Sequence, residues 1–215
     1  MNKSGLYSFY NSVFPHPMEV FKKEISGFDK VLDVGCGDNS PIQYCNIPFS
    51  VGLDLFEPYI QRSKEKGIHD QYVKSDIRYA NFEPDSFDLV ICMDVIEHLT
   101  KKEGLILMEN MGVWAKKKVI VYTTNGYVSQ DEYDSNPLQK HRSGWTVPEL
   151  RNLGYDIYGM YGWKMLRGHK SQPRYRPHMA FRVLSDITQK ITYRIPNYAF
   201  GLLSVKELSD AENNH

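Results

Sequence analysis

The sequence predicts an α/β fold with a mostly parallel sheet, and two features support this class. Short apolar, β-branched runs recur along the 215-residue chain and end at glycine or aspartate, as buried parallel strands do. Segments with apolar residues at helical spacing separate these runs, and this alternation is typical of βαβ units. Polar residues at the strand ends are therefore candidates for a ligand site.

The first two expected strands carry the most informative residues. The strand at 30–34 runs into the sequence Asp33-Val34-Gly35-Cys36-Gly37, in which paired glycines let the backbone turn close to a ligand. The strand at 49–53 ends at Asp54, whose carboxylate can accept hydrogen bonds from both hydroxyls of a ribose. A nicotinamide dinucleotide fingerprint would need a third glycine where Ser40 stands, so that fingerprint is incomplete.

Two later blocks follow in order. Lys74-Ser75-Asp76-Ile77 closes a third strand, and SFDLVICMDVIEHL at 86–99 contains a fourth. With the glycine turn, these blocks resemble motifs I, II and IV of the class I S-adenosylmethionine-dependent methyltransferases of the small-molecule type (type 11 or type 23). The resemblance is strong over 28–125 and general over 140–206. It implies a Rossmann-like, doubly wound, seven-stranded, mostly parallel sheet with one late antiparallel strand.

The remaining elements follow from apolar spacing and end signals. A helix beginning at Pro17 has Met18, Phe21 and Ile25 on one face, which would lie against the sheet or over the cofactor cleft. The other expected elements are helices at 57–66, around 107–115, from a capping box at 146–149 to Gly154, and at 180–191, with strands at 118–122, 155–161 and 199–205.

We expect one domain over 1–215, with an N-terminal helical segment (1–27), a cofactor-binding half (28–125) and an acceptor-side half (126–215) with a loop and a helical lid.

The numbers of acidic and basic residues are equal, 26 of each, which argues against a global electrostatic field that would attract nucleic acid. Three cysteines without metal-ligand spacing favour a reduced, cytoplasmic protein. No apolar run approaches the ~20 residues of a membrane span, and no signal peptide is evident. The sequence does not indicate an oligomeric state.

By resemblance, the cofactor is S-adenosylmethionine. Asp33 would organise its methionine end, and the turn of Gly35, Cys36 and Gly37 would admit the backbone beside it. The resemblance gives the other contacts as follows: Asp54 holds the ribose, Leu55 flanks the adenine, Asp76 and Ile77 clamp the base, and Met93 and Asp94 line the site beside the methyl group.

The acceptor side carries weaker signals. His98 and His141 are candidate general bases because histidine's ordinary pKa of ~6.5 suits proton transfer near neutrality, although His98 can equally be a structural residue. In the polar loop at 125–145, Tyr127 and Trp145 are candidates for the substrate pocket; alternatively, Trp145 docks on the core. We expect no metal site, because the histidines are not at ligand spacing on one element.

The segment 163–178 is basic and lacks acidic residues. It favours a lid whose Arg167, Arg174 or Arg176 binds an anionic group, although such a run is more often solvated surface. The expected function is therefore methyl transfer from S-adenosylmethionine to a small acceptor, with an anionic one suggested by this segment. Two alternatives stay open: a non-catalytic S-adenosylmethionine-binding protein and, with less support, a nicotinamide-dependent oxidoreductase.

Overall fold

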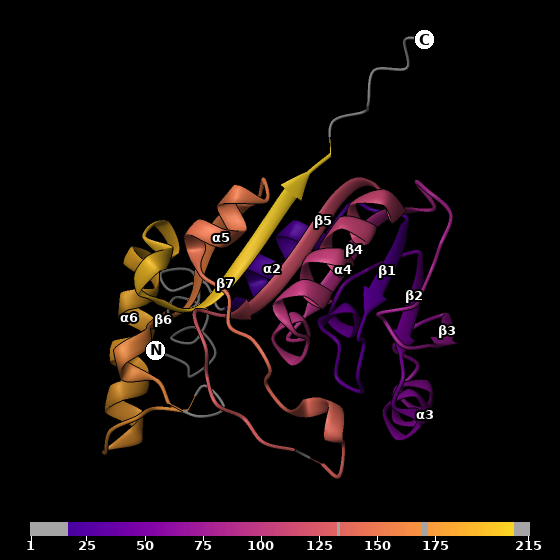
Figure 1. Ribbon diagram of the computed structural model, residues 1–215. Coiled ribbons are helices and arrows are strands. Elements are labelled where there is room, and N and C mark those ends of the chain that lie inside the picture. The colour runs from indigo at the N-terminus through magenta and orange to yellow at the C-terminus, as the bar shows by residue number, and fades with distance from the viewer. Residues whose placement is uncertain (1–16, 133, 169–171, 209–215) are drawn as a thin grey trace, which may run out of the picture.

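The computed structural model describes residues 17–132, 134–168 and 172–208. A sheet lies at its centre (Figure 1), and this sheet has seven strands. The strand order is β3-β2-β1-β4-β5-β7-β6. β7 runs antiparallel to both of its neighbours, β5 and β6, and the other pairings are parallel. The expected sheet with one late antiparallel strand is confirmed. The strands are β1 (Lys30–Val34), β2 (Phe49–Asp54), β3 (Gln71–Lys74), β4 (Phe87–Met93), β5 (Ala115–Thr124), β6 (Asp156–Trp163) and β7 (Ala199–Glu207).

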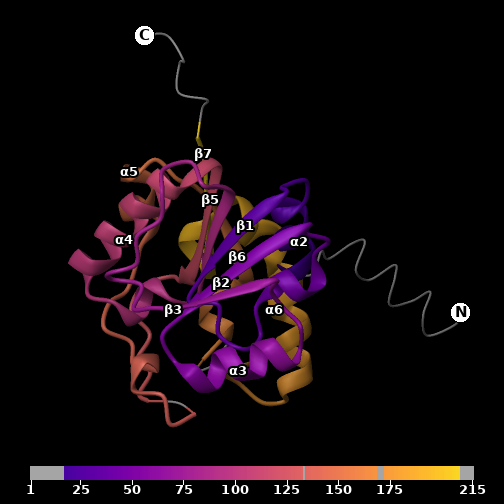
Figure 2. The same ribbon diagram turned by 90° about the vertical axis from the view of Figure 1, so that its right-hand side faces the viewer.

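Helices lie on both faces of this sheet, as the end-on view in Figure 2 shows. α4 and α5 lie on one side, and α2 and α6 lie on the other. Among the described residues, no helix combines the length and apolarity needed to cross a bilayer. The helices are α2 (Pro17–Ile25), α3 (Glu57–Glu65), α4 (Lys101–Trp114), α5 (Val147–Asn152) and α6 (His178–Arg194).

β4 shows why the central strands read as unbroken apolar runs. Its Val90 and Cys92 join the hydrophobic cluster that contains α4 and α5, whereas Leu89 and Ile91 join the cluster that contains α2. Both faces of the strand are buried, so polar residues cannot alternate along it. Apart from Asp88 near its start, β4 has its first polar position after Met93, and the site is built there.

The expected helices form with small shifts in their bounds. α4 begins at Lys101, ahead of the apolar residues that predicted it, because Thr100 and Glu103 form a capping box. The predicted capping box of Thr146 and Glu149 also forms and starts α5. β1 and β2 are joined by a single 3₁₀ turn at Pro41–Tyr44.

α6 packs on β6 through polar contacts. The Gln189 side chain accepts from Gly162 N at 2.6 Å and donates to the Gly159 carbonyl at 2.8 Å, and Ser185 Oγ donates to the Tyr161 carbonyl at 2.9 Å. A Cβ on Gly159 would lie 2.0 Å from the Thr192 carbonyl oxygen, so the helix backbone approaches the strand closely at a glycine. The buried face of α6 is therefore polar.

Candidate cofactor and acceptor site

The glycine turn after β1 is held against the end of β2. Gly35 and Gly37 have φ angles of 71° and 55°, which favour glycine. Gly35 N and Cys36 N both donate to the Leu53 carbonyl, at 2.7 and 3.0 Å. A Cβ on Gly35 would lie 2.5 Å from Val95 Cγ2. The turn thus needs glycine at Gly35 both for its backbone angles and for its approach to Val95.

Asp54, at the end of β2, lies with its carboxylate beside this turn. Its Oδ2 accepts from Gly37 N at 2.9 Å and its Oδ1 accepts from Phe56 N at 2.8 Å. Each carboxylate oxygen has about two acceptor sites, so one on each oxygen stays available to a ligand. Burial raises the pKa of this carboxyl, although the backbone donors from Phe56 and Gly37 oppose the rise.

Two adjoining cavities open at this edge of the sheet. The first, which we call the loop cavity, has about 830 Å³ of open space and lies between the strand ends and residues 136–142. The second, the helix cavity, has about 1080 Å³ and lies between the glycine turn, α2 and the ends of β4 to β6. The two cavities share five lining residues: Gly35, Gly37, Tyr59, Asp94 and Gln139.

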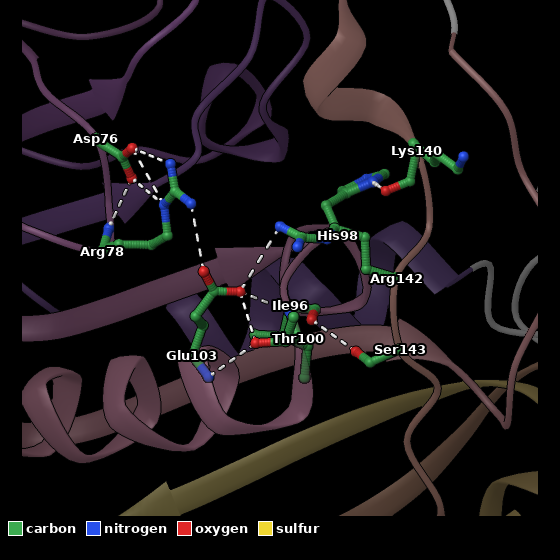
Figure 3. Close-up of polar contacts among 9 residues, drawn as sticks. All are labelled: Asp76, Arg78, Ile96, His98, Thr100, Glu103, Lys140, Arg142 and Ser143. Carbon is green, nitrogen blue, oxygen red and sulfur yellow. Dashed lines mark hydrogen bonds and ion pairs between the residues drawn. The ribbon is translucent and has the colours of Figure 1, made fainter.

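The loop cavity contains the residues expected around an adenine. Leu55 and Ile77 line it with Asp76. The Asp76 carboxylate accepts from Arg78 Nε at 2.9 Å and Nη2 at 2.5 Å, and Arg78 also bonds to Glu103, as Figure 3 shows. The arginine lowers the pKa of Asp76, so a negatively charged hydrogen-bond acceptor lines the loop cavity here.

Asp33 lines the helix cavity and has a buried histidine beside it. His69 Nε2 lies 3.4 Å from Asp33 Oδ2, and both atoms are buried without a hydrogen-bond partner. Burial raises the pKa of Asp33 to about 7 and lowers that of His69 to about 4. Sequence reasoning missed His69, because it lies 36 residues further along the chain and follows no motif.

Aromatic side chains form the far wall of the helix cavity. Phe21 of α2, Tyr122 of β5 and Tyr161 of β6 line it with Met93. The Phe21 and Tyr122 rings meet edge to face at 5.7 Å between centroids. The apolar face of the first helix pointed to Phe21 from the sequence, whereas no local signal marked the two tyrosines.

Asp94 follows β4 and lines both cavities. Its φ of 53° lies in the left-handed region, which aspartate tolerates better than most residues. Its side chain shares a hydrogen bond with Glu97. Burial raises the pKa of Asp94 to about 7 and that of Glu97 well above its usual range, so this carboxyl pair can hold a proton at neutral pH.

His98 and His141 lie together, with ring centroids 4.8 Å apart. His98 lines the loop cavity and its Nδ1 lies 3.3 Å from the Lys140 carbonyl (Figure 3), whereas His141 is buried and lines neither cavity. Burial lowers the pKa of His98 to about 4. Ligand atoms of Glu97, His98 and His141 all lie within 4.8 Å of one another. The expectation of no metal site rested on the spacing of the histidines along the sequence, and tertiary folding nevertheless brings two of them to Glu97. The absence of a metal stays a prediction.

Trp145 is a core residue. Its side chain is fully buried, donates from Nε1 to the Ile96 carbonyl at 3.3 Å, and packs on Gly104, where a Cβ would lie 2.6 Å from the indole. It lines neither cavity, so its expected place in the substrate pocket is corrected in favour of docking on the core. Tyr127 is exposed outside both linings.

The arginines of the basic segment also lie outside both linings. Arg167 pairs with Asp186 at 3.3 Å and donates to Ser185 Oγ and the Tyr161 carbonyl, both at 2.9 Å. Arg174 and Arg176 are exposed. His169 and Lys170 fall outside the described residues. Contact of these arginines with an acceptor stays a prediction.

The family model and the relatives that match this chain are all methyltransferases. A family model described as "Methyltransferase domain" matches residues 32–113. The sterol 24-C-methyltransferase of Yarrowia lipolytica is 32% identical over 165 residues, covering 64% of this chain and 42% of its own length. That of Saccharomyces cerevisiae is 29% identical over 168 residues, covering 70% and 38%. The chain thus spans about two fifths of the length of these relatives.

Solved structures share the fold across nearly the whole chain. An S-adenosylmethionine-dependent methyltransferase from Archaeoglobus fulgidus superposes with a TM-score of 0.56 at 21% identity, covering 94% of this chain and 99% of its own. The plantazolicin methyltransferase in complex with S-adenosylhomocysteine gives a TM-score of 0.53 at 12% identity, covering 96% and 90%. At these identities the likeness shows the fold.

Proposed function

Because this chain belongs to the class I S-adenosylmethionine-dependent methyltransferases and its cofactor is S-adenosylmethionine, we propose that it methylates a small-molecule acceptor. The observation that carries the proposal is the pair of adjoining cavities that meet at Gly35, Gly37 and Asp94. One is suited to a nucleoside. The other offers room for an amino acid end and an acceptor beside it.

Two carboxylates support this placement of the cofactor. Asp54 in the loop cavity keeps acceptor sites for two ribose hydroxyls, next to apolar Leu55 and Ile77 for the adenine. Asp33 in the helix cavity has an unpartnered buried oxygen, which suits the ammonium of the methionine end. The bound cofactor supplies an activated methyl group on a sulfonium.

The residues of the chain then position the acceptor and exclude water. Methyl transfer is an in-line displacement, which depends mainly on alignment. Met93, Tyr122 and Tyr161 offer an apolar and aromatic surface to the acceptor, and α2 covers this cavity with Phe21. An acceptor hydroxyl would need a base. The candidates are Asp94, which lines both cavities, and His98, which lines the loop cavity; His141 would act only through its neighbours.

The acceptor class rests on two further observations. The relatives named above act, by their names, on sterols, and a ubiquinone biosynthesis O-methyltransferase of Vibrio atlanticus is 31% identical over 84 residues, covering 36% of this chain and 35% of its own length. The aromatic wall of the helix cavity suits a ring-bearing acceptor. An anionic group on it is supported only by the charge of segment 163–178.

The proposal is tested in two measurements. Calorimetric titration with S-adenosylhomocysteine should give one site, and titration with NAD should give none. Transfer of label from methyl-labelled S-adenosylmethionine should then be measured over a panel of sterols, quinone precursors and phosphorylated or carboxylated small molecules. Binding of S-adenosylhomocysteine without turnover of any acceptor would favour the non-catalytic binding protein instead.

A further inference from the structure

A buried cluster of metal-ligating side chains lies beside the loop cavity. Glu97, His98 and His141 each present one ligand atom, and the three atoms lie within 4.8 Å of one another. A first-row ion holds its nitrogen and oxygen ligands at ~2.0 to 2.2 Å, so two ligand atoms on one ion lie at most ~4.4 Å apart. Ligands at tetrahedral or cis positions lie closer, at roughly 3 to 3.6 Å, so side-chain movements of up to about 1 to 2 Å would close the site.

Hydrogen bonds from the backbone orient both imidazoles for this purpose. His141 Nδ1 lies 2.6 Å from the Val128 carbonyl, and His98 Nδ1 lies 3.3 Å from the Lys140 carbonyl. A carbonyl oxygen only accepts, so Nδ1 carries the proton in each of these two bonds, and Nε2 is the nitrogen that would bind an ion. Metal-binding histidines are usually fixed by such a second hydrogen bond.

Glu97 is fixed in the same way. Thr123 Oγ1 donates to Glu97 Oε2 at 2.9 Å. The Glu97 carbonyl accepts from Arg142 N and Ser143 N at 2.8 and 3.0 Å, which holds the segment after His141 against the turn that carries His98. Because the three ligands come from two segments tied together at Glu97, the cluster is preorganised.

From this geometry we propose that Glu97, His98 and His141 bind a divalent first-row transition ion, such as Mn²⁺, Co²⁺ or Zn²⁺. Two imidazoles and one carboxylate are a ligand set that these ions prefer. Of the three ligands, His98 lines the loop cavity, as does the neighbouring Asp94, so an ion would reach the cluster from that cavity.

Metal binding is tested without any activity measurement. Protein stripped with a chelator is titrated calorimetrically with Zn²⁺ and Mn²⁺, and Co²⁺ loading is followed by its ligand-field absorption. We expect one ion per chain, with affinity lowered at least tenfold in H141A and E97Q, because the loss of one ligand from three removes a large share of the binding. The matched control is H178A, which removes an exposed histidine of α6.

Folding and cofactor binding are checked separately. Each variant should keep its circular dichroism and its affinity for S-adenosylhomocysteine, so failure of the metal proposal is distinguishable from failure of the proposed function. Addition of Zn²⁺ to the unmodified protein should also shift the Nε2 nitrogen resonances of two histidines. Absence of a stoichiometric site, or equal affinity in H141A and the native chain, would overturn the proposal.

A second inference comes from the outer face of α6. This face is apolar and exposed, opposite the polar face that packs on β6. Its side chains follow helical spacing and continue just beyond the helix: Met179, Val183, Leu184, Ile187, Ile191 and Ile195. A helix of a globular domain normally turns such a stripe inward, and contiguous exposed apolar patches mark interaction sites.

The charges around this stripe select the partner. The segment 163–194 contains eight lysines and arginines and one acidic residue, Asp186, whereas the whole chain has no net charge. Asp186 is paired with Arg167. An apolar stripe in a strongly basic setting fits an anionic bilayer surface, where such helices lie in the interface with their apolar side among the acyl chains.

We infer that α6 docks this face onto membranes containing anionic phospholipid. The protein should co-sediment with vesicles of phosphatidylcholine and phosphatidylglycerol, far less with phosphatidylcholine alone, and less at high salt. The double variant I187E/I191E should lose at least ~90% of this binding, since it puts two charges into the apolar face. The matched control L105E/I106E changes two exposed apolar residues of α4 and should bind like the native chain.

Two results would overturn this inference. One is the absence of binding to anionic vesicles. The other is a concentration-dependent dimer in sedimentation velocity that I187E/I191E abolishes, which would assign the face to a second copy of the chain.

Discussion

The cofactor end of the sheet and the α6 region bury opposite kinds of side chain. At the cofactor end, the carboxyl groups of Asp33, Asp54 and Glu97 are buried within an apolar frame. At α6, Ser185, Gln189 and Thr192 are buried and the apolar residues face outward. At α6, Gln189 and Ser185 hydrogen-bond to the backbone of β6, whereas at the cofactor end an oxygen of Asp33 is buried without a hydrogen-bond partner. Buried polar residues therefore form a candidate ligand site in one region and attach α6 to β6 in the other.

The largest expected effect contrasts two isoleucines. Ile91 is fully buried in β4, whereas Ile191 on α6 is 63% exposed. I91A should lower the free energy of unfolding by about 2 to 5 kcal/mol, because it leaves a cavity in the core. I191A should change it by less than about 0.5 kcal/mol. Urea denaturation of both variants checks the contrast, and equal losses would show that α6 buries its apolar face in solution.

The next effect tests the close contact between α6 and β6. Gly162 has a φ of 71°, and its Cβ would lie 2.1 Å from the Ser185 carbonyl oxygen. G162A should cost about 2 to 4 kcal/mol of unfolding free energy, from overpacking and backbone strain together. G27A is the matched control, because Gly27 has a φ of 87° with nothing within 4 Å of its Cβ and thus incurs backbone strain alone. The same loss in both variants would remove the packing argument.

Cofactor affinity tests the carboxylates of the other region. D54A should weaken S-adenosylhomocysteine binding more than tenfold, since hydrogen bonds to a charged group contribute roughly 1.5 to 3 kcal/mol. The matched control is D88A, which removes a carboxylate that accepts from Lys30 N at the start of β1, the opposite end of that strand. Unchanged calorimetric affinity in D54A would refute the ribose assignment.

The last prediction, the smallest per unit of pH, is a pH dependence at Asp33. Its folded pKa of about 7 lies above its ordinary value of 3.8, so its contribution to stability is fully present below pH 3.8 and is lost as the pH rises towards 7. His69, with a pKa lowered to about 4, has the opposite slope between pH 4 and 6.5. D33N isolates the aspartate. The unfolding free energy of the native chain minus that of D33N should fall with pH by up to about 1.4 kcal/mol per unit. A pH-independent difference in denaturation experiments would contradict the burial-raised pKa.

Much of the cofactor end could be predicted from the sequence because its signals are local. A buried parallel strand is mostly apolar, a glycine or aspartate follows or closes it, and a tight turn needs glycine at particular positions. These constraints act within a few residues. They predicted the turn at Gly35 and Gly37 and the strand end at Asp54, whereas the late antiparallel β7 was implied by the resemblance to the methyltransferase family.

Only the tertiary structure decided which distant side chains meet. His69 reaches Asp33, and His141 reaches Glu97 and His98, across connections that carry no periodic signal. The sequence also determined that 180–191 forms an amphipathic helix, but the direction of its apolar face depended on two glycines of β6 and on the hydrogen bonds of Gln189. Periodicity specifies that a helix has two different faces. Which face is buried depends on the shape and the polar groups of the surface against which it packs, and these come from another part of the chain.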